Sequence, residues 1–296
     1  MELNQIKKFS YTDILGWSVS RHDKFMLCRR QYYYDYYAKY DTEYGRLKID
    51  SLKKMTSIPL EIGNIVHDVI KVFLERLLKT EKAIDKTKFL KYAEEKTNEY
   101  CKSKTFSEVY YKAIPSLDIK LLFEKVELIL NNLINSKRYN WIIDKAIENK
   151  RGWVIEPPGY GETRINDLKA YCKVDFLFPV ENKIYILDWK TGKKDEIKHK
   201  KQLVGYSLWA SYHFGKKPED IVPIDVYMKP VYEEMQIEVT GADIEKFSNT
   251  VKEETKAMYE FCDNIEKNIP KGKDKFEQTQ NLSICNYCNY RELCSR

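Results

Sequence analysis

Long hydrophobic runs are missing from this sequence, since no stretch approaches the ~18 uninterrupted apolar residues of a membrane-spanning helix. The first residues, Met1 to Gln5, lack the charged and apolar regions of a secretory signal peptide. Internal repeats and low-complexity segments are also missing, which argues against a repeat architecture. A glycine-rich phosphate-binding loop is likewise missing, which argues against a nucleotide-driven motor. We therefore expect a soluble, cytoplasmic protein.

The composition is that of a globular protein. The 296 residues suffice for one large domain or two ordinary ones, and 43% of them are hydrophobic and 32% charged. The 51 Lys and Arg outnumber the 45 Asp and Glu, a net charge of +6 that permits a polyanionic partner without requiring one. Seven cysteines in a cytosolic chain indicate metal ligands or free thiols rather than disulfides.

The hydrophobic patterning predicts an α/β fold with a mixed sheet core flanked by helices. Helices are expected over residues 18–40, 61–79, 196–213 and 242–268, and through 84–149 with a break near Pro115. Strands are expected over 153–156, 170–180, 183–189, 221–229 and 234–240. These elements divide the chain into an N-terminal arm (1–60), a helical region (61–150), a sheet core (151–240) and a C-terminal helix with a cysteine tail (241–296).

Two aspartates flank neighbouring apolar strands. Asp175 begins one apolar run and Asp188 ends the next, so a hairpin turn at Glu181-Asn182 would bring both to the same end of the sheet. Two carboxylates so placed repel each other unless a cation lies between them, and Mg²⁺ or Mn²⁺ suits hard oxygen ligands and phosphate substrates. Lys190 projects to the same face as Asp188, where it could orient an attacking water. Alternatively, the strand ends in an ordinary solvated turn.

The cysteine tail contains a C-x2-C-x5-C cluster formed by Cys285, Cys288 and Cys294. With Cys28 near the start of the chain, four thiolates could hold a metal centre that joins the two ends. Four cysteines suit either tetrahedral Zn²⁺ or a cubane iron–sulfur cluster. The other three cysteines, Cys101, Cys172 and Cys262, are expected to be buried free thiols.

A dense basic and aromatic run extends from Arg29 to Tyr37. Arginines beside aromatic rings suit phosphates and unstacked bases. The alternative, weighted equally, is a helix that buries some of these rings and exposes others.

Several short motifs, none specific alone, occur together in one order. The ordered set is Ser18-Val19-Ser20 leading to Cys28-Arg29-Arg30-Gln31-Tyr32, Gly63-Asn64-Ile65-Val66-His67, Val174-Asp175, Asp188-Trp189-Lys190-Thr191-Gly192, Gln202-Leu203-Val204-Gly205-Tyr206, and the three tail cysteines. This set resembles the PD-(D/E)XK nuclease superfamily, in particular its RecB-like branch with a C-terminal iron–sulfur cluster. That branch includes the CRISPR adaptation nuclease and the nuclease module of the AddB helicase–nuclease subunit.

The resemblance implies a single nuclease domain over 1–296, with a restriction-endonuclease-like core, a helical insertion and an iron–sulfur staple. It implies that His67, Asp175, Asp188 and the carbonyl of Trp189 bind the metal, and that Lys190 is catalytic. Gln202 and Tyr206, four residues apart on one helical face, would contact the DNA strand. An imidazole ligand would also fit a preference for Mn²⁺. One departure is Cys172, which stands where the family often has glycine.

The implied activity is metal-dependent hydrolysis of DNA phosphodiesters, as an exonuclease on single strands or strand ends. Cys28, Cys285, Cys288 and Cys294 would bind a structural [4Fe-4S] cluster, and a separate helicase or CRISPR adaptation proteins would be partners. Two alternatives remain: a non-catalytic nucleic-acid-binding subunit, and a zinc-stapled scaffold of a DNA-processing complex.

Overall fold

The structure is a computed structural model that describes residues 6–80 and 84–296. The segment 1–5, whose composition argued against a signal peptide, lies outside the described residues. No helix in the described ranges is both long and apolar enough to cross a bilayer.

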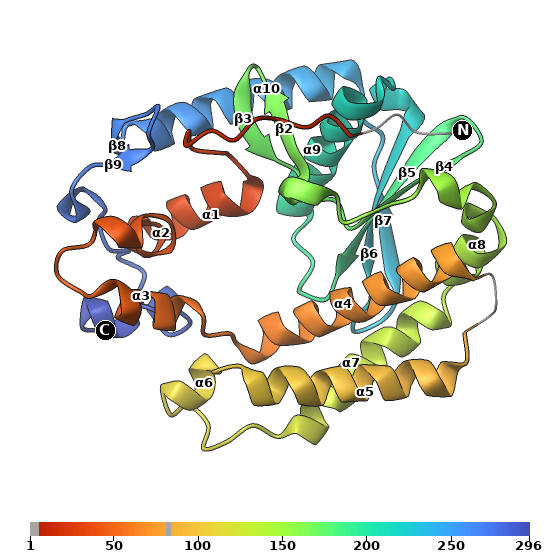
Figure 1. The fold of residues 1–296 in the computed structure, drawn as a ribbon, viewed down its shortest axis with the longest axis horizontal. Coiled ribbons are helices and arrows are strands. Elements are labelled where there is room, and N and C mark those ends of the chain that lie inside the picture. Colours follow the sequence, from red (N-terminus) through yellow and green to blue (C-terminus); the bar gives the residue numbers. More distant parts are fainter. Residues whose placement is uncertain (1–5, 81–83) are drawn as a thin grey trace.

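A five-stranded mixed sheet lies at the centre of the fold (Figure 1). Its spatial order is β1-β4-β5-β6-β7, and only β5 and β6 are parallel. The strands are β1 (Val154–Ile155), β4 (Phe176–Val180), β5 (Lys183–Lys190), β6 (Ile221–Tyr227) and β7 (Glu233–Gln236). The parallel pair is connected by α9 (Glu196–Phe214), as a parallel connection requires a crossover. The predicted α/β class with a mixed sheet is confirmed.

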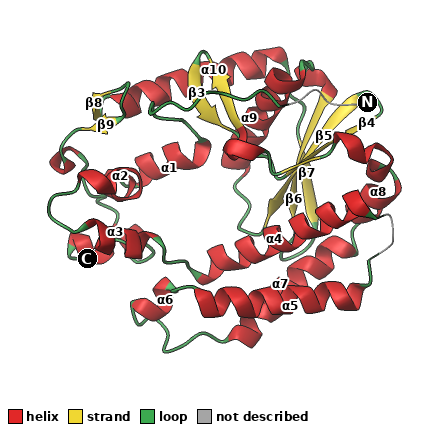
Figure 2. Ribbon diagram, in the orientation of Figure 1, coloured by secondary structure: helices red, strands yellow, loops and turns green. Residues whose placement is uncertain are grey.

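Helices cover both faces of the sheet (Figure 2). On one face, α4 (Ile58–Lys79) and its neighbours pack through their apolar stripes against Phe176, Phe178 and Trp189. On the other face, α9 packs Leu203 and Trp209 against the sheet. The remaining elements of the first layer are α5 (Lys86–Ser103), α6 (Ser107–Tyr110), α7 (Ile119–Ile134), α8 (Lys137–Asp144) and the 3-10 segment Ala146–Gly152. The predicted helical region is therefore confirmed.

The two ends of the chain share a separate hydrophobic core. Trp17, Phe25 and Tyr32 pack there with Phe276 and Tyr290. Figure 1 shows α1 to α3 beside the C-terminus, on the side of the molecule away from β4 and β5. The elements of this part are α1 (Val19–Leu27), α2 (Arg29–Tyr37), α3 (Arg46–Lys53), α10 (Gly241–Tyr259), β8 (Cys262–Asn264), β9 (Ile269–Pro270), α11 (Leu282–Cys285), and the 3-10 turns Ala38–Tyr40, Lys273–Lys275 and Arg291–Cys294.

Three predicted elements are wrong in extent. The helix expected over 18–40 breaks at Cys28, whose backbone is extended (φ −160°, ψ 110°), because the N–H of Arg30 bonds the carbonyl of Glu277 in the C-terminal segment. The helix expected over 242–268 ends at Tyr259, because the polar residues that follow turn back and pair β8 with β9.

The strand expected over 170–180 is two strands in different sheets. Its first part is β3 (Leu168–Tyr171), which pairs with β2 (Glu162–Ile165) and receives a backbone bond from Trp17. Its second part is β4. The chain leaves β3 where the N–H of Cys172 bonds the carbonyl of Gly161, in the 3-10 turn Pro158–Gly161.

Gly161 is required where the chain leaves β3. Its φ is +67°, and a Cβ would lie 2.2 Å from the carbonyl oxygen of Cys172. Gly159 has a similar φ of +65°, but a Cβ there would meet nothing within 4 Å. A side chain at Gly159 would therefore cause backbone strain alone, whereas a side chain at Gly161 would add steric overlap.

We expect Gly161→Ala to lower the free energy of unfolding by about 3 kcal/mol, combining left-handed strain with overpacking. Gly159→Ala should lower it by about 1 kcal/mol, from strain alone. Urea denaturation of both variants measures the difference, and equal losses would contradict the close approach of Gly161 to Cys172.

Candidate active site

Asp175 and Asp188 lie side by side at one end of the β4–β5 hairpin. The hairpin turns at Glu181 and Asn182 and pairs Phe176 with Leu187. Asp175 directly precedes Phe176 and Asp188 directly follows Leu187, so the two aspartates lie next to this pair. Both side chains are buried, with exposures of 8% and 5%. The sequence-based prediction that the two carboxylates meet at the same end of the sheet is confirmed.

His67 connects α4 to the first carboxylate. Its Nδ1 lies 3.3 Å from Oδ1 of Asp175, and its Nε2–H donates to the carbonyl of Trp189 at 2.9 Å. The backbone N–H of Trp189 donates in turn to Oδ2 of Asp175 at 2.8 Å. Burial alone would lower the pKa of His67, but Asp175 and then Asp188 raise it to about 9. His67 is therefore an imidazolium at neutral pH in the metal-free protein.

Lys190 and Tyr206 bind the second carboxylate. The ammonium of Lys190 forms an ion pair with Asp188 and donates to Oε1 of Gln202 at 2.7 Å. The hydroxyl of Tyr206 donates to Oδ1 of Asp188 at 2.8 Å. Gln202 and Tyr206 both come from α9, so the four residues meet across the sheet–helix interface.

The pKa values of the two carboxylates are shifted in opposite directions. Burial opposes ionisation of both, but His67 and Lys190 hold the pKa of Asp175 below its ordinary value. Burial and the charge of Asp175 raise the pKa of Asp188, against the opposing effect of Lys190. Two cations, His67 and Lys190, thus face two carboxylates, and ionisation is favoured more strongly at Asp175 than at Asp188.

Asp225 is a third buried carboxylate that the sequence analysis did not identify. It pairs in register with Asp188 in the parallel β5–β6 ladder and is 0% exposed. Neither of its oxygens has a hydrogen-bond partner, and Oδ1 lies 3.5 Å from Nζ of Lys190. Burial and then Asp188 raise its pKa to about 7, although Lys190 opposes the shift. An aspartate inside an otherwise apolar strand was the available signal.

No group of three or more His, Cys, Asp or Glu side chains within 6–80 and 84–296 is arranged to hold a metal ion. The oxygen atoms available to a metal ion here are the two adjoining carboxylates and the nearby Trp189 carbonyl. His67 contacts Asp175 and the Trp189 carbonyl, and Lys190 contacts Asp188. An ion at this position would displace these cationic contacts.

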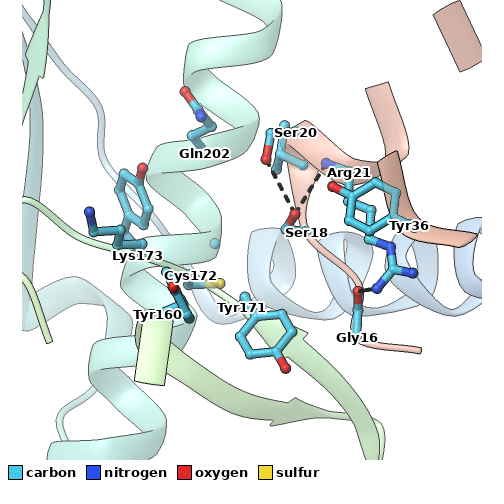
Figure 3. Close-up of a pocket in the computed structure, with 13 residues that line it drawn as sticks. Gly16, Ser18, Ser20, Arg21, Tyr36, Tyr160, Tyr171, Cys172, Lys173 and Gln202 are labelled. Carbon is cyan, nitrogen blue, oxygen red and sulfur yellow. Dashed lines mark hydrogen bonds between the residues drawn. The ribbon is translucent and has the colours of Figure 1, made fainter. Parts of the chain in front are cut away.

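Figure 3 shows the residues that line a cavity of about 510 Å³. Gln202 and Tyr206 form part of its wall, so it adjoins the partners of Lys190 and Asp188. The other lining residues are Gly16, Ser18, Val19, Ser20, Arg21, Tyr36, Tyr160, Tyr171, Cys172, Lys173 and Gly205. On the α4 side of the site, His67 and Lys173 line a second cavity of about 490 Å³.

The Arg29–Tyr37 run is mostly a core element. Tyr32, Tyr33, Tyr34 and Tyr37 are buried, whereas Tyr36 is 39% exposed. The alternative of a helix that buries some of these rings and exposes others is therefore confirmed for this segment.

The four cysteines of the predicted metal centre lie together. Cys28, Cys285, Cys288 and Cys294 all line one small cavity between the two ends of the chain. Burial, with a further contribution from the other three thiols, raises the pKa of Cys288 to about 12. Cys101, Cys172 and Cys262 are buried and unpaired, as predicted. The thiol of Cys172 packs towards Gly205 on α9, since a Cβ at Gly205 would lie 3.5 Å from it.

The model of the PD-(D/E)XK nuclease superfamily matches residues 16–295 of this chain. The chain belongs to this superfamily. No curated protein matches the chain. A solved structure named "Crystal structure of SSO0001" aligns at 18% identity over 70% of this chain and 95% of that chain, with a TM-score of 0.31.

His199 lies next to the site of this PD-(D/E)XK protein, and the charge of Lys190 in that site affects its pKa. Its Nδ1 lies 2.6 Å from the hydroxyl of Tyr227, and burial, followed by the charge of Lys190, lowers its pKa to about 4. In the unfolded chain a histidine has a pKa of about 6.5. Between these values only the unfolded chain takes up the proton, so stability falls as pH falls.

We expect His199→Gln to flatten this acid-dependent loss, because glutamine does not titrate and can still bond Tyr227. Urea unfolding at about pH 7 and about pH 5 compares the two proteins. Wild type should lose more stability between these values than the variant. Equal losses would show that His199 is not the buried neutral group described.

Proposed function

We propose that the protein is a metal-dependent deoxyribonuclease that hydrolyses phosphodiesters of single-stranded DNA or strand ends. The observation that carries this proposal is the meeting of Asp175, Asp188 and Lys190 at one end of the β4–β5 hairpin. Membership of the PD-(D/E)XK superfamily supports it, because members of that superfamily are typically nucleases. A non-catalytic strand-binding subunit would not need that trio.

The residues fit a hard divalent cation such as Mg²⁺ or Mn²⁺. Mg²⁺ is commonly held by one or two carboxylates with waters and substrate phosphates. Such a site does not require a group of three or more His, Cys, Asp or Glu side chains, and the described residues contain no such group. Burial and the neighbouring charge of Asp175 raise the pKa of Asp188, and a cation at this position would favour its ionised form. Asp175, Asp188 and the Trp189 carbonyl would hold the ion, with His67 as a nitrogen ligand once deprotonated.

A bound ion of this kind polarises the scissile phosphate and lowers the pKa of a coordinated water. The protein's own groups would do the rest. Lys190, held by Gln202 at 2.7 Å, would orient the attacking water and stabilise charge on the phosphate oxygens. Gln202 and Tyr206, which line the 510 Å³ cavity, would contact the strand on either side of the scissile bond.

We further propose a place in the RecB-like branch, with the chain acting as one nuclease domain in the cytoplasm. A separate helicase or CRISPR adaptation proteins would deliver the strand. The supporting observation is that Cys28 lies with Cys285, Cys288 and Cys294 around one cavity. Thiolates suit a thiophilic centre, although the four thiols as placed in the described residues do not form a metal-binding group. We propose that they hold a structural [4Fe-4S] cluster, with Zn²⁺ as the alternative.

Lys190→Ala should reduce cleavage of single-stranded DNA in Mn²⁺ by at least about 100-fold, because a preorganised charge at the phosphate is removed. Lys183→Ala is the matched control, since Lys183 is exposed at the other end of β5. A nuclease assay on end-labelled strands measures both. Undiminished cleavage by Lys190→Ala would reject the proposed active site.

Cys294→Ser should remove iron and the visible absorption of the purified protein and lower its thermal stability, because one cluster ligand is lost. Cys101→Ser, at a buried thiol outside the cavity, should retain both iron and colour. Metal analysis and visible spectroscopy check the pair. Stoichiometric zinc without iron in wild type would instead establish the zinc alternative.

A further inference from the structure

The 510 Å³ cavity beside the acid pair has walls of two kinds. Figure 3 shows Arg21 and Tyr36 on one side of it, and Gln202 with Lys173 on the other. Tyr160 belongs to the lining but not to the packed core, since its side chain is 74% exposed. The lining therefore combines aromatic rings with cationic groups next to the proposed catalytic residues.

Tyr160 is held in an unusual backbone conformation. Its φ and ψ of 58° and 26° lie in the left-handed region, which is unfavourable for a residue with a side chain. Gly159 and Gly161 on either side also have positive φ, of 65° and 67°. Within the described chain, its ring has neither a stacking nor a hydrogen-bond partner. Strain of this kind tends to persist where it positions a functional group.

Arg21 forms a fixed cationic wall opposite. Its guanidinium lies 4.1 Å from the ring centroid of Tyr36, Nη1 donates to the carbonyl of Gly16 at 3.0 Å, and Nε donates to Tyr32 at 3.2 Å. These contacts fix the plane of the guanidinium and leave Nη2 available to an anion. Lys173 adds a second cation, with a side chain that is 46% exposed although paired with Glu156 at 3.4 Å.

We infer that this cavity is a nucleobase subsite, in which an unpaired base of a single-stranded polynucleotide stacks on Tyr160 while a neighbouring phosphate binds Arg21. Stacking on an aromatic face does not depend on base identity, so the subsite selects unpaired strands rather than a sequence. A duplex would be disfavoured, because its bases are stacked on one another. The inference deepens the proposed nuclease function and rests on it, because the subsite adjoins the proposed catalytic residues.

The test measures binding separately from cleavage. Lys190→Ala protein without divalent cations is titrated with labelled oligothymidine and with an abasic strand of the same length. Adding Tyr160→Ala should weaken oligothymidine binding about tenfold and leave binding of the abasic strand unchanged. Tyr160→Phe should retain tight binding, because the stacking face remains.

Two further variants control for folding and for nonspecific effects. Tyr160→Gly removes the ring, and glycine adopts a positive φ without strain. This variant should therefore weaken binding as Tyr160→Ala does, without disturbing the loop. Tyr11→Ala removes a tyrosine that is 84% exposed and outside the cavity lining, and it should leave binding unchanged.

Equal weakening of base-containing and abasic strand binding by Tyr160→Ala would overturn the inference while leaving the nuclease proposal intact. The same holds if neither Tyr160→Ala nor Tyr160→Gly has an effect. Equal affinity for duplex and single strand would also overturn it. Tyr160-dependent binding in a wild-type protein that cleaves nothing would support the subsite and reject the nuclease proposal. Absence of any strand binding would overturn both.

Discussion

Two carboxylates that adjoin at the end of a buried hairpin are the constraint on which the rest of this structure depends. Asp175 and Asp188 would repel each other without compensation, and burial makes that repulsion stronger. The compensation comes from both faces of the sheet. On one side His67 of α4 contacts Asp175. On the other, Asp188 contacts Tyr206 of α9 and pairs with Lys190, which donates to Gln202 of α9. The helices that cover the sheet therefore also determine which groups reach the site.

The shared core of the chain termini has a similar double role. It joins α1 and α2 to the C-terminal segments, with the four clustered thiols at its edge. It also brings Arg21 and Tyr36 to the cavity that adjoins Gln202. A metal centre that stabilises this core would consequently stabilise one wall of the cavity, although the centre lies outside it. Such coupling would give the cysteines an indirect role in forming the proposed substrate site.

The parts of the site that could be predicted depend on local patterns. Apolar runs on both sides of Glu181-Asn182 predict the hairpin, and the hairpin alone brings the two aspartates together. Asp225 was missed because its neighbour Asp188 lies on a strand separated from it by a helix, so only the tertiary register joins them. The break at Cys28 was missed because it depends on packing between chain ends that no local pattern records. The early end of α10 has another cause, since the chain turns back there and pairs β8 with β9.

The central claim is that one divalent ion binds between the ends of β4 and β5. Anomalous diffraction from crystals soaked in Mn²⁺ tests it most directly. We expect a manganese peak within coordination distance of both Asp175 and Asp188, with Lys190 displaced from its contact with Asp188. Manganese bound only elsewhere, with the ion pair of Lys190 and Asp188 intact, would contradict the account.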